Sequence, residues 1–193
     1  ADAALTAARS AANVLEAKFS LAFVAAMAGK RGDLSLAEAS FAKATALNAQ
    51  DHLYSKRGLD KADLHLRLGD HTRARTETEA HLETCTYHDV GEDIADCHYL
   101  LGRCALPDDP TAARAHLAEV RSWATRTGDV EAVLHAHRLA AELALAEADP
   151  AAALAEAEEG LTVADGLGFG LLAIDLRLLA ARAADPARSL TYA

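Results

Sequence analysis

The stretch GDLSLAEASFAKA, residues 32–44, carries the features that decide the fold. It opens with a glycine followed by Asp33, and aspartate is a favoured residue at the N-cap of a helix. Ala37, Phe41 and Ala44 follow Asp33 at offsets of four, eight and eleven residues, which places them on one face of an α-helix. The stretch therefore predicts a helix that begins after Asp33 and packs through this face.

Aspartates at similar points along the chain begin further copies of this pattern. They are separated by 36 to 40 residues, and each adjoins a glycine or a proline: Asp33, Asp70, Asp109, Asp149 and Asp185. A small residue stands four positions after each of them: Ala37, Ala74, Ala113, Ala153 and Ser189. Small residues at a fixed offset allow two helices to approach closely. We therefore expect these residues to pack inside the repeats: Ala37, Phe41, Ala44, Ala74, Ala113, Leu117 and Ala153.

A second set of apolar stripes lies between these helices and predicts their partners. The stripes follow helical spacing and are separated from the first set by turns rich in Gly, Asn or Asp. They predict these helices: Ala12–Ala28, Leu53–Leu68, Gly91–Leu106, Val130–Ala148 and Leu171–Ala184. The chain is thus predicted to be all-α, a right-handed α-solenoid of about four to five helical hairpins with a period of 36–40 residues.

The composition agrees with packed helices and excludes some partners. Alanine supplies 48 of the 193 residues and aromatic residues only 5%, which favours helices over sheets. The formal charge of −10 opposes binding to nucleic acids and anionic membranes, since both require a cationic face. No apolar stretch reaches the roughly 18 residues of a membrane span, and three widely spaced cysteines favour a reducing compartment. We therefore expect a cytoplasmic protein that binds neither nucleic acid nor membrane.

Both ends of the chain are predicted to fall inside a repeat. Residues 5–13 align with residues 161–169, the end of a repeat and its turn, and Ala193 stands only eight residues after Asp185. Repeat arrays normally finish with polar capping helices. We therefore expect residues 1–193 to be a single array excised from a longer one, with uncapped ends that can self-associate. A natural short protein with frayed ends is the alternative.

The spacing of Ala37, Phe41 and Ala44 resembles the second helix of a tetratricopeptide repeat, although the period exceeds the usual 34 residues. Residues 158–184 are similar to repeats of the elongated tetratricopeptide arrays of the maltose-regulon activator type. The resemblance implies the sensor region of a larger bacterial signal-transduction ATPase. Two repeats depart from the pattern, and we expect them to pack more loosely or to bend, at Thr78, His81, Ala157 and Gly160.

The function implied by this resemblance is non-enzymatic recognition of a protein or peptide. Such arrays bind through a concave groove lined by the first helix of each hairpin. Counting back from the aspartates places these residues in the groove: Lys56, Asp63, Arg67, His98, His135, Arg138 and Glu142. On this view Arg138→Glu weakens partner binding and leaves stability nearly unchanged. Two alternatives stay open: an array that senses a small molecule by changing its curvature, and plain solvated surface at all seven positions.

No motif indicates an enzyme. The chain lacks GxSxG, HExxH and a phosphate-binding glycine loop with its Lys-Ser/Thr tail, so no catalytic residue, cofactor or metal is expected. The most tempting cluster is His81, Cys85 and His88 at helical spacing, followed across a turn by Asp89, Asp93, Cys97 and Cys104. Imidazole and thiolate ligands at this spacing can hold zinc. Cysteine is also a small, usually buried apolar residue, so ordinary packing is the expected role and a metal-dependent function is the third alternative.

Overall fold

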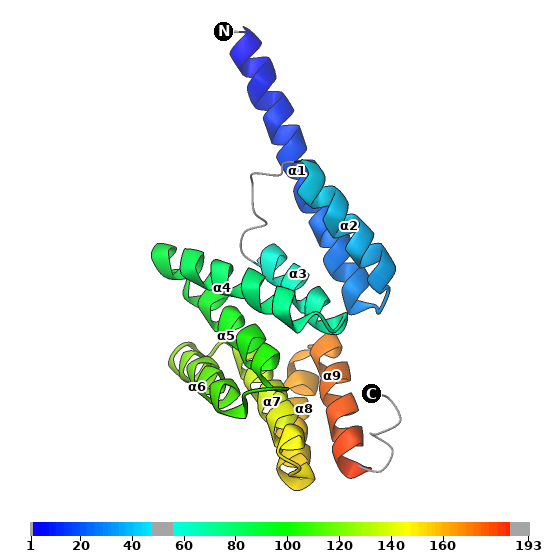
Figure 1. The fold of residues 1–193 in the computed structure, drawn as a ribbon, viewed down its shortest axis with the longest axis vertical. Helices are drawn as coiled ribbons and strands as arrows, with labels where there is room; N and C mark the ends of the chain where they lie inside the picture. The colour runs from blue at the N-terminus through cyan, green and yellow to red at the C-terminus, as the bar shows by residue number, and fades with distance from the viewer. Residues whose placement is uncertain (1, 48–55, 186–193) are drawn as a thin grey trace. The chain divides into compact units, whose positions relative to one another are not determined.

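The computed structural model describes residues 2–47 and 56–185, with side chains from residue 13 onward, and within these ranges it contains helices and no strand (Figure 1). The helices are α1 (Asp2–Lys30), α2 (Leu34–Leu47), α3 (Lys56–Arg67), α4 (His71–His88), α5 (Gly91–Ala105), α6 (Pro110–Thr127), α7 (Val130–Ala146), α8 (Pro150–Leu167) and α9 (Gly170–Ala184). The all-α class is therefore confirmed. None of these helices combines the length and the apolar composition of a membrane-spanning segment.

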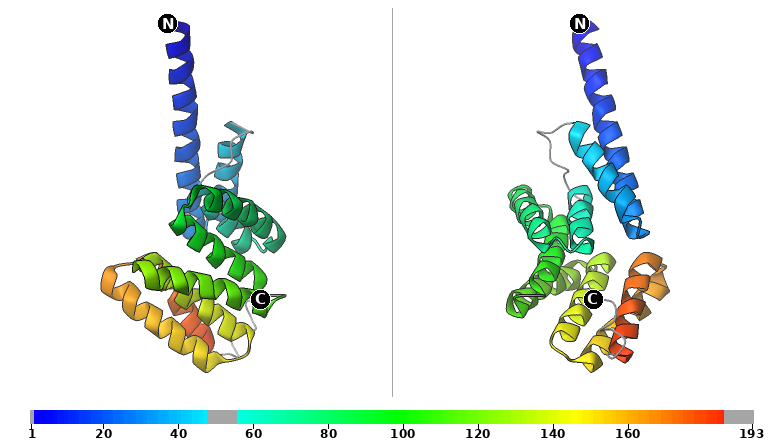
Figure 2. Two further views of the ribbon diagram at one scale, coloured as in Figure 1. Left: turned by 90° about the vertical axis from the view of Figure 1, so that its left-hand side faces the viewer. Right: turned by 45° about the vertical axis from the view of Figure 1, so that its right-hand side comes forward.

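Contacts between Cα atoms divide the chain into two compact units, Ala1–His81 and Leu82–Ala193, with the boundary inside the continuous helix α4. In the first unit α1 packs alongside α2, and α3 contacts both (Figure 2). In the second unit each helix from α5 to α9 packs against the next. Helix α7 also contacts α5 and α9, so it packs between the other two odd-numbered helices of this unit.

The predicted aspartate caps are present at four helix starts. Each carboxylate accepts a hydrogen bond from the backbone N–H three residues later, at 3.0–3.1 Å, in Asp33, Asp70, Asp109 and Asp149. These bonds satisfy N–H groups that have no partner inside the helix. Asp185 instead follows the last residue of α9 as its C-cap, and the helix expected after it, including Ser189 and Ala193, lies outside the described residues.

The even-numbered helices α2, α4, α6 and α8 bury the face that the sequence pattern predicts. Each of the seven expected packing residues is at most 6% exposed: Ala37, Phe41, Ala44, Ala74, Ala113, Leu117 and Ala153. Between α7 and α9 the core is layered, and each layer takes one alanine from α8: Ala153, Ala157 and Ala164. The repeated small residues therefore sit where three helices meet.

Helix α1 is longer than predicted. The sequence comparison placed the end of a helix and a turn in residues 5–13, whereas α1 runs without a break from Asp2 to Lys30. Residues 161–169 contain two glycines, and residues 2–28 contain neither glycine nor proline. An alanine-rich segment without such residues favours a continuous helix, so the predicted turn was wrong.

The loose packing predicted at Gly160 was also wrong. A Cβ atom at this position would lie 2.9 Å from Cβ of His137 on α7 and 3.0 Å from Leu176 on α9. Glycine therefore allows α8 to approach its neighbours more closely than alanine would. Thr78, another of the four departures from the repeat pattern, is fully buried, and its hydroxyl donates to the carbonyl of Ala74 at 2.7 Å.

This close approach predicts opposite effects for two substitutions on α8. We expect Gly160→Ala to lower the free energy of unfolding by about 1–3 kcal/mol, because His137 Cβ is fixed to its backbone and the helices must separate. Gly166→Ala is the matched control, since no atom lies within 4 Å of its added Cβ, and it should stabilise the protein by about 0.5–1 kcal/mol. Urea unfolding followed by circular dichroism measures both. Equal effects of the two substitutions would contradict the close approach.

Candidate functional site

Three of the seven predicted groove residues meet on the face that α7 shares with α5 and α9. They are His135, Arg138 and Glu142, all on α7. Four further side chains from α5 and α9 join them. We call the whole set the charged cluster: Asp96, Tyr99, Arg103, His135, Arg138, Glu142 and Asp175.

Glu142 lies at the centre of the ion pairs and accepts a hydrogen bond on each carboxylate oxygen. Arg103 Nε on α5 donates to Oε2 at 3.0 Å, and Arg138 Nε donates to Oε1 at 3.2 Å. The other end of the Arg138 guanidinium donates to Asp175 on α9. One continuous chain of ion pairs therefore connects three helices.

Tyr99 of α5 lies beside these ion pairs and holds the imidazole of His135. The two rings are stacked, with centroids 4.0 Å apart and an angle of 2° between their planes. His135 Nδ1 is 3.3 Å from Asp96 Oδ1 on α5. The guanidinium carbons of Arg103 and Arg138 lie 5.5 and 6.0 Å from the Tyr99 ring centroid, within cation–π range.

The surroundings keep the central pair ionised. Burial raises the pKa of Glu142, but Arg103 and Arg138 outweigh it and the net shift is downward. Burial and the neighbouring Arg103 lower the pKa of Arg138. Tyr99, Glu142 and Asp175 raise this pKa by a larger amount, so the net shift is upward. Glu142 and Arg138 therefore form a pair of fixed charges at the centre of the cluster.

Arg138 is not a solvated surface residue, although the nearly neutral effect expected of Arg138→Glu assumed that it is. Only 8% of Arg138 is exposed, and its charge is compensated by two carboxylates. A glutamate there would place a third carboxylate beside Glu142 and Asp175, with Arg103 as the remaining guanidinium group of the cluster. We therefore expect Arg138→Glu to destabilise the fold, and it cannot serve as a test of binding alone.

The other four predicted residues lie elsewhere. Lys56, Asp63 and Arg67 belong to α3 in the first unit, where Arg67 Nε donates to Asp63 at 2.7 Å. His98 of α5 faces α6 and forms a 3.0 Å Nδ1–Nδ1 contact with His116. Burial lowers the pKa of His98, with Glu119 opposing it, and one of the two facing nitrogens must carry a proton for this hydrogen bond.

The first unit contains its own ion cluster between α3 and α4. Glu77 accepts a hydrogen bond from Lys61 Nζ at 2.8 Å and lies 3.5 Å from His65 Nε2. Burial alone would raise the pKa of Glu77, but the contacts with His65 and Lys61 lower it to about 2. The ionised carboxylate is therefore a stabilising group in this unit.

This shift predicts an acid-sensitive contribution to stability. The pKa of Glu77 is lower in the folded state than the unfolded value of about 4.5. The carboxylate therefore contributes its full stabilisation above pH 4.5, and this stabilisation is lost as the pH falls towards about 2. Glu77→Gln should lower the melting temperature at pH 7, and the difference from the unsubstituted chain should disappear near pH 2. Glu79→Gln, on an exposed position of the same helix, is the control. A difference that persists unchanged at low pH would contradict the assignment to this carboxylate.

A different surface lies along α1. A hollow of about 560 Å³ is lined mainly by Leu15, Phe19, Phe23 and Val24, with Arg57 of α3 at its edge. The Arg57 guanidinium lies 5.4 Å from the centroid of the Phe19 ring. This hollow is mostly apolar and shares no residue with the charged cluster.

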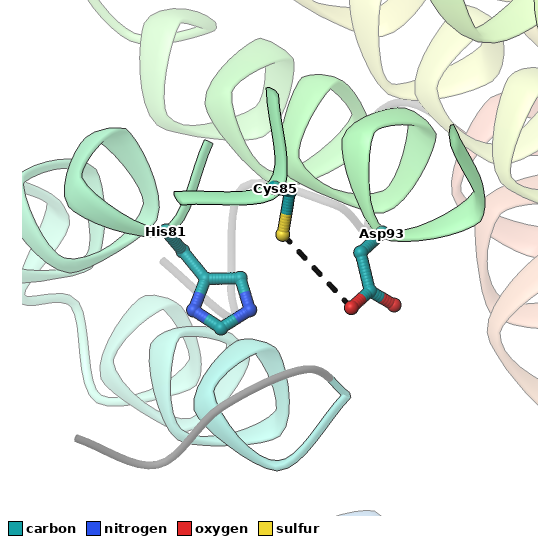
Figure 3. Close-up of side chains that lie close together, drawn as sticks. All are labelled: His81, Cys85 and Asp93. Atoms are coloured by element: carbon teal, nitrogen blue, oxygen red, sulfur yellow. Dashed lines mark hydrogen bonds between the residues drawn. The ribbon is translucent and has the colours of Figure 1, made fainter. Parts of the chain in front are cut away.

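Two groups of side chains in the described part of the chain offer ligands of the kind that metal ions bind. In the first, Cys85 Sγ lies 3.9 Å from Asp93 Oδ2, and His81 stands one helical turn before Cys85 on α4 (Figure 3). The second consists of His137, Glu156 and Glu159 on α7 and α8. His88, which the sequence pattern grouped with His81 and Cys85, is exposed and contacts the ring of Tyr87 edge-on.

Sequence reasoning missed four members of the charged cluster, although the repeat period could have found them. Arg103 and Glu142 are 39 residues apart, and Arg138 and Asp175 are 37 residues apart. Positions separated by one period thus face one another on neighbouring odd-numbered helices. Applying the period to the predicted residues His135, Arg138 and Glu142 leads to Asp96, Tyr99, Arg103 and Asp175.

Comparison with known proteins adds no assignment to this geometry. No protein-family model, no curated protein and no solved structure matches the chain.

Proposed function

We propose that the chain is a non-enzymatic recognition scaffold that binds an extended peptide or a partner helix on the face formed by α5, α7 and α9. In this proposal the helices form a right-handed solenoid of the tetratricopeptide type. The array would act as the sensor or interaction segment of a larger bacterial signalling protein in the cytoplasm. The observation that carries the proposal is the charged cluster, to which three successive odd-numbered helices contribute.

The state of these side chains favours recognition. The side chains of the six members other than Tyr99 are 10–22% exposed, so they combine fixed positions with residual access to a ligand. Groups that are already held in place lose little conformational entropy on binding. Two guanidinium groups can donate to carbonyl or carboxylate oxygens, and the stacking of His135 on the buried Tyr99 ring fixes the imidazole beside them.

A matched pair of substitutions tests this proposal. Peptides would be selected from a random-sequence displayed library against the purified chain, and their affinities measured by fluorescence anisotropy. We expect Asp175→Asn, which removes a charge from the cluster, to weaken binding of the selected peptides at least about tenfold. Asp165→Asn removes the same charge from an exposed ion pair with Arg177 and should leave binding unchanged.

Circular dichroism would verify that both variants fold. Failure to select any binding peptide would reject the proposal. Equal affinities of the unsubstituted chain and Asp175→Asn would also reject it, because the bound surface would then lie elsewhere.

A further inference from the structure

Four side chains with zinc-ligand chemistry gather where α4 is followed by α5. Cys85 lies near the end of α4, and Asp93 and Cys97 lie in the first two turns of α5. His81 stands one turn before Cys85 on the same continuous helix. We infer that Cys85, Asp93 and Cys97, with His81 as the fourth ligand, form a zinc site, which we call the thiol site.

The ligand atoms of His81, Cys85 and Asp93 lie close enough together to surround one zinc ion, since all are within 4.8 Å of one another. Zn–S bonds near 2.3 Å and Zn–O bonds of 2.0–2.2 Å separate the two ligand atoms by about 3.6 Å in a tetrahedral site. Cys85 Sγ and Asp93 Oδ2 lie 3.9 Å apart, so a contraction of only a few tenths of an ångström is needed (Figure 3). The Cys97 thiol is a neighbour of the Cys85 thiol but lies outside this set of three, so Cys97 must turn towards the ion to complete the site.

The electrostatics of the thiol site favour a cation. Asp93 is 5% exposed and forms no ion pair with any residue that the structure describes. Its place in the first turn of α5 offsets part of the cost of burying this carboxylate. A divalent ion between Asp93 and the two sulfur atoms would compensate the charge directly, as buried charges require.

The thiols are neutral without a metal ion. Burial, followed by the charge of Asp93, raises the pKa of Cys85 to about 11, and burial raises that of Cys97 further. Binding then exchanges one proton on each thiol for a sulfur–zinc bond and releases two protons to solvent. No electron is transferred. The resulting set of two sulfur atoms, one imidazole nitrogen and one carboxylate oxygen carries the same net charge as the common Cys₃His structural site.

The other group of potential ligands is a weaker candidate. Glu156 already accepts hydrogen bonds from Arg121 and His137, and Glu159 is exposed. This group of His137, Glu156 and Glu159 contains no sulfur, so the spectrum of a bound metal ion distinguishes it from the thiol site.

Titration of the reduced full chain with Co²⁺, a spectroscopic substitute for Zn²⁺, tests the inference. We expect saturation at one ion per chain, the visible bands of tetrahedral cobalt, and a thiolate-to-cobalt charge-transfer band in the near ultraviolet. Addition of Zn²⁺ should abolish these bands. The absence of binding would overturn the inference, and so would a bound cobalt ion without the charge-transfer band, which would place it at a site without sulfur, such as His137, Glu156 and Glu159.

Two cysteine variants complete the test. Cys85→Ala should weaken Co²⁺ binding at least about a hundredfold, since loss of a direct ligand exceeds the 10–100-fold effect of second-shell changes. Cys104→Ala, at a fully buried cysteine of α5 outside the thiol site, should bind within about twofold of the unsubstituted chain. Equal affinities of these two variants would overturn the inference. If Cys85→Ala fails to fold, Asp93→Asn takes its place with the same expected direction.

Discussion

Replacing Arg138 by methionine should lower the free energy of unfolding by about 3–5 kcal/mol, which is one of the two largest effects that we expect from a single substitution. The variant removes a buried cation, so Asp175 loses its ion pair with Arg138 and Glu142 keeps only its ion pair with Arg103. Breaking a buried ion pair by deleting one partner is costly, because the remaining charge stays desolvated. Urea unfolding followed by far-ultraviolet circular dichroism measures the loss.

Arg177→Met provides the matched control for this prediction. Arg177 forms an ion pair with Asp165, and both side chains are more than half exposed. Exposed ion pairs contribute little, so we expect a change within about 0.5 kcal/mol. If Arg138→Met lost no more than Arg177→Met, the cluster would be solvated and its ion pairs would not hold the helices together.

A fourfold replacement separates the structural role of the charged cluster from its role in binding. Arg103→Met, Arg138→Met, Glu142→Leu and Asp175→Leu together remove the ion-paired core and leave no isolated charge within it. Buried ion pairs replaced by apolar residues of similar size often leave stability unchanged or raise it. A stable fourfold variant that no longer binds selected peptides would show that the charges are retained for recognition.

The helix starts and the packing register could be predicted from the sequence because both depend on local chemistry. An aspartate cap requires only a carboxylate and the next few N–H groups, as at Asp109 and Asp149. The buried face of α8 follows from small residues at fixed offsets within one helix. Such signals need no knowledge of what the helix packs against.

The burial of Arg138 could not be predicted in this way. Arginine is mostly exposed in proteins, so its occurrence on a predicted groove face indicates a solvated charge. Its burial depends on Asp175 of α9 and on Arg103 and Glu142, which together balance the local charge. These contacts form only when repeats 37 and 39 residues apart are stacked.

The thiol site illustrates the same dependence on tertiary contacts. Spacing on one helix suggested His81, Cys85 and His88, because the pattern i, i+4, i+7 defines a face. Helix α4 directs His88 to solvent, and the turn into α5 brings Asp93 and Cys97 towards Cys85 instead. Helical spacing identified His81 and Cys85. The sequence also indicated Asp89, Asp93, Cys97 and Cys104 across the turn, but which of these approach Cys85 depends on the geometry of the turn.

The second large effect is expected from Leu134→Ala on α7. Leu134 is fully buried and packs with Ala164 of α8 and with Ala173 and Leu176 of α9. Truncating a buried leucine costs about 2–5 kcal/mol, and the cost rises with the volume of the cavity that remains. Two of the three other buried residues of this layer are alanines, which are too short to fill the space, so we expect a loss in the upper half of this range.

Leu178→Ala on α9 is the control for this cavity, because Leu178 is 59% exposed and its truncation should change stability by less than about 0.5 kcal/mol. The size of the loss at Leu134 distinguishes two states of the layer between α7, α8 and α9. A rigid layer keeps an apolar cavity that can bind benzene, which would then raise the melting temperature of Leu134→Ala alone. A loss below about 1 kcal/mol, with no effect of benzene, would mean that the helices close over the space. The fixed spacing between α7 and α9 would then be wrong, and so would the preformed charged cluster that depends on it.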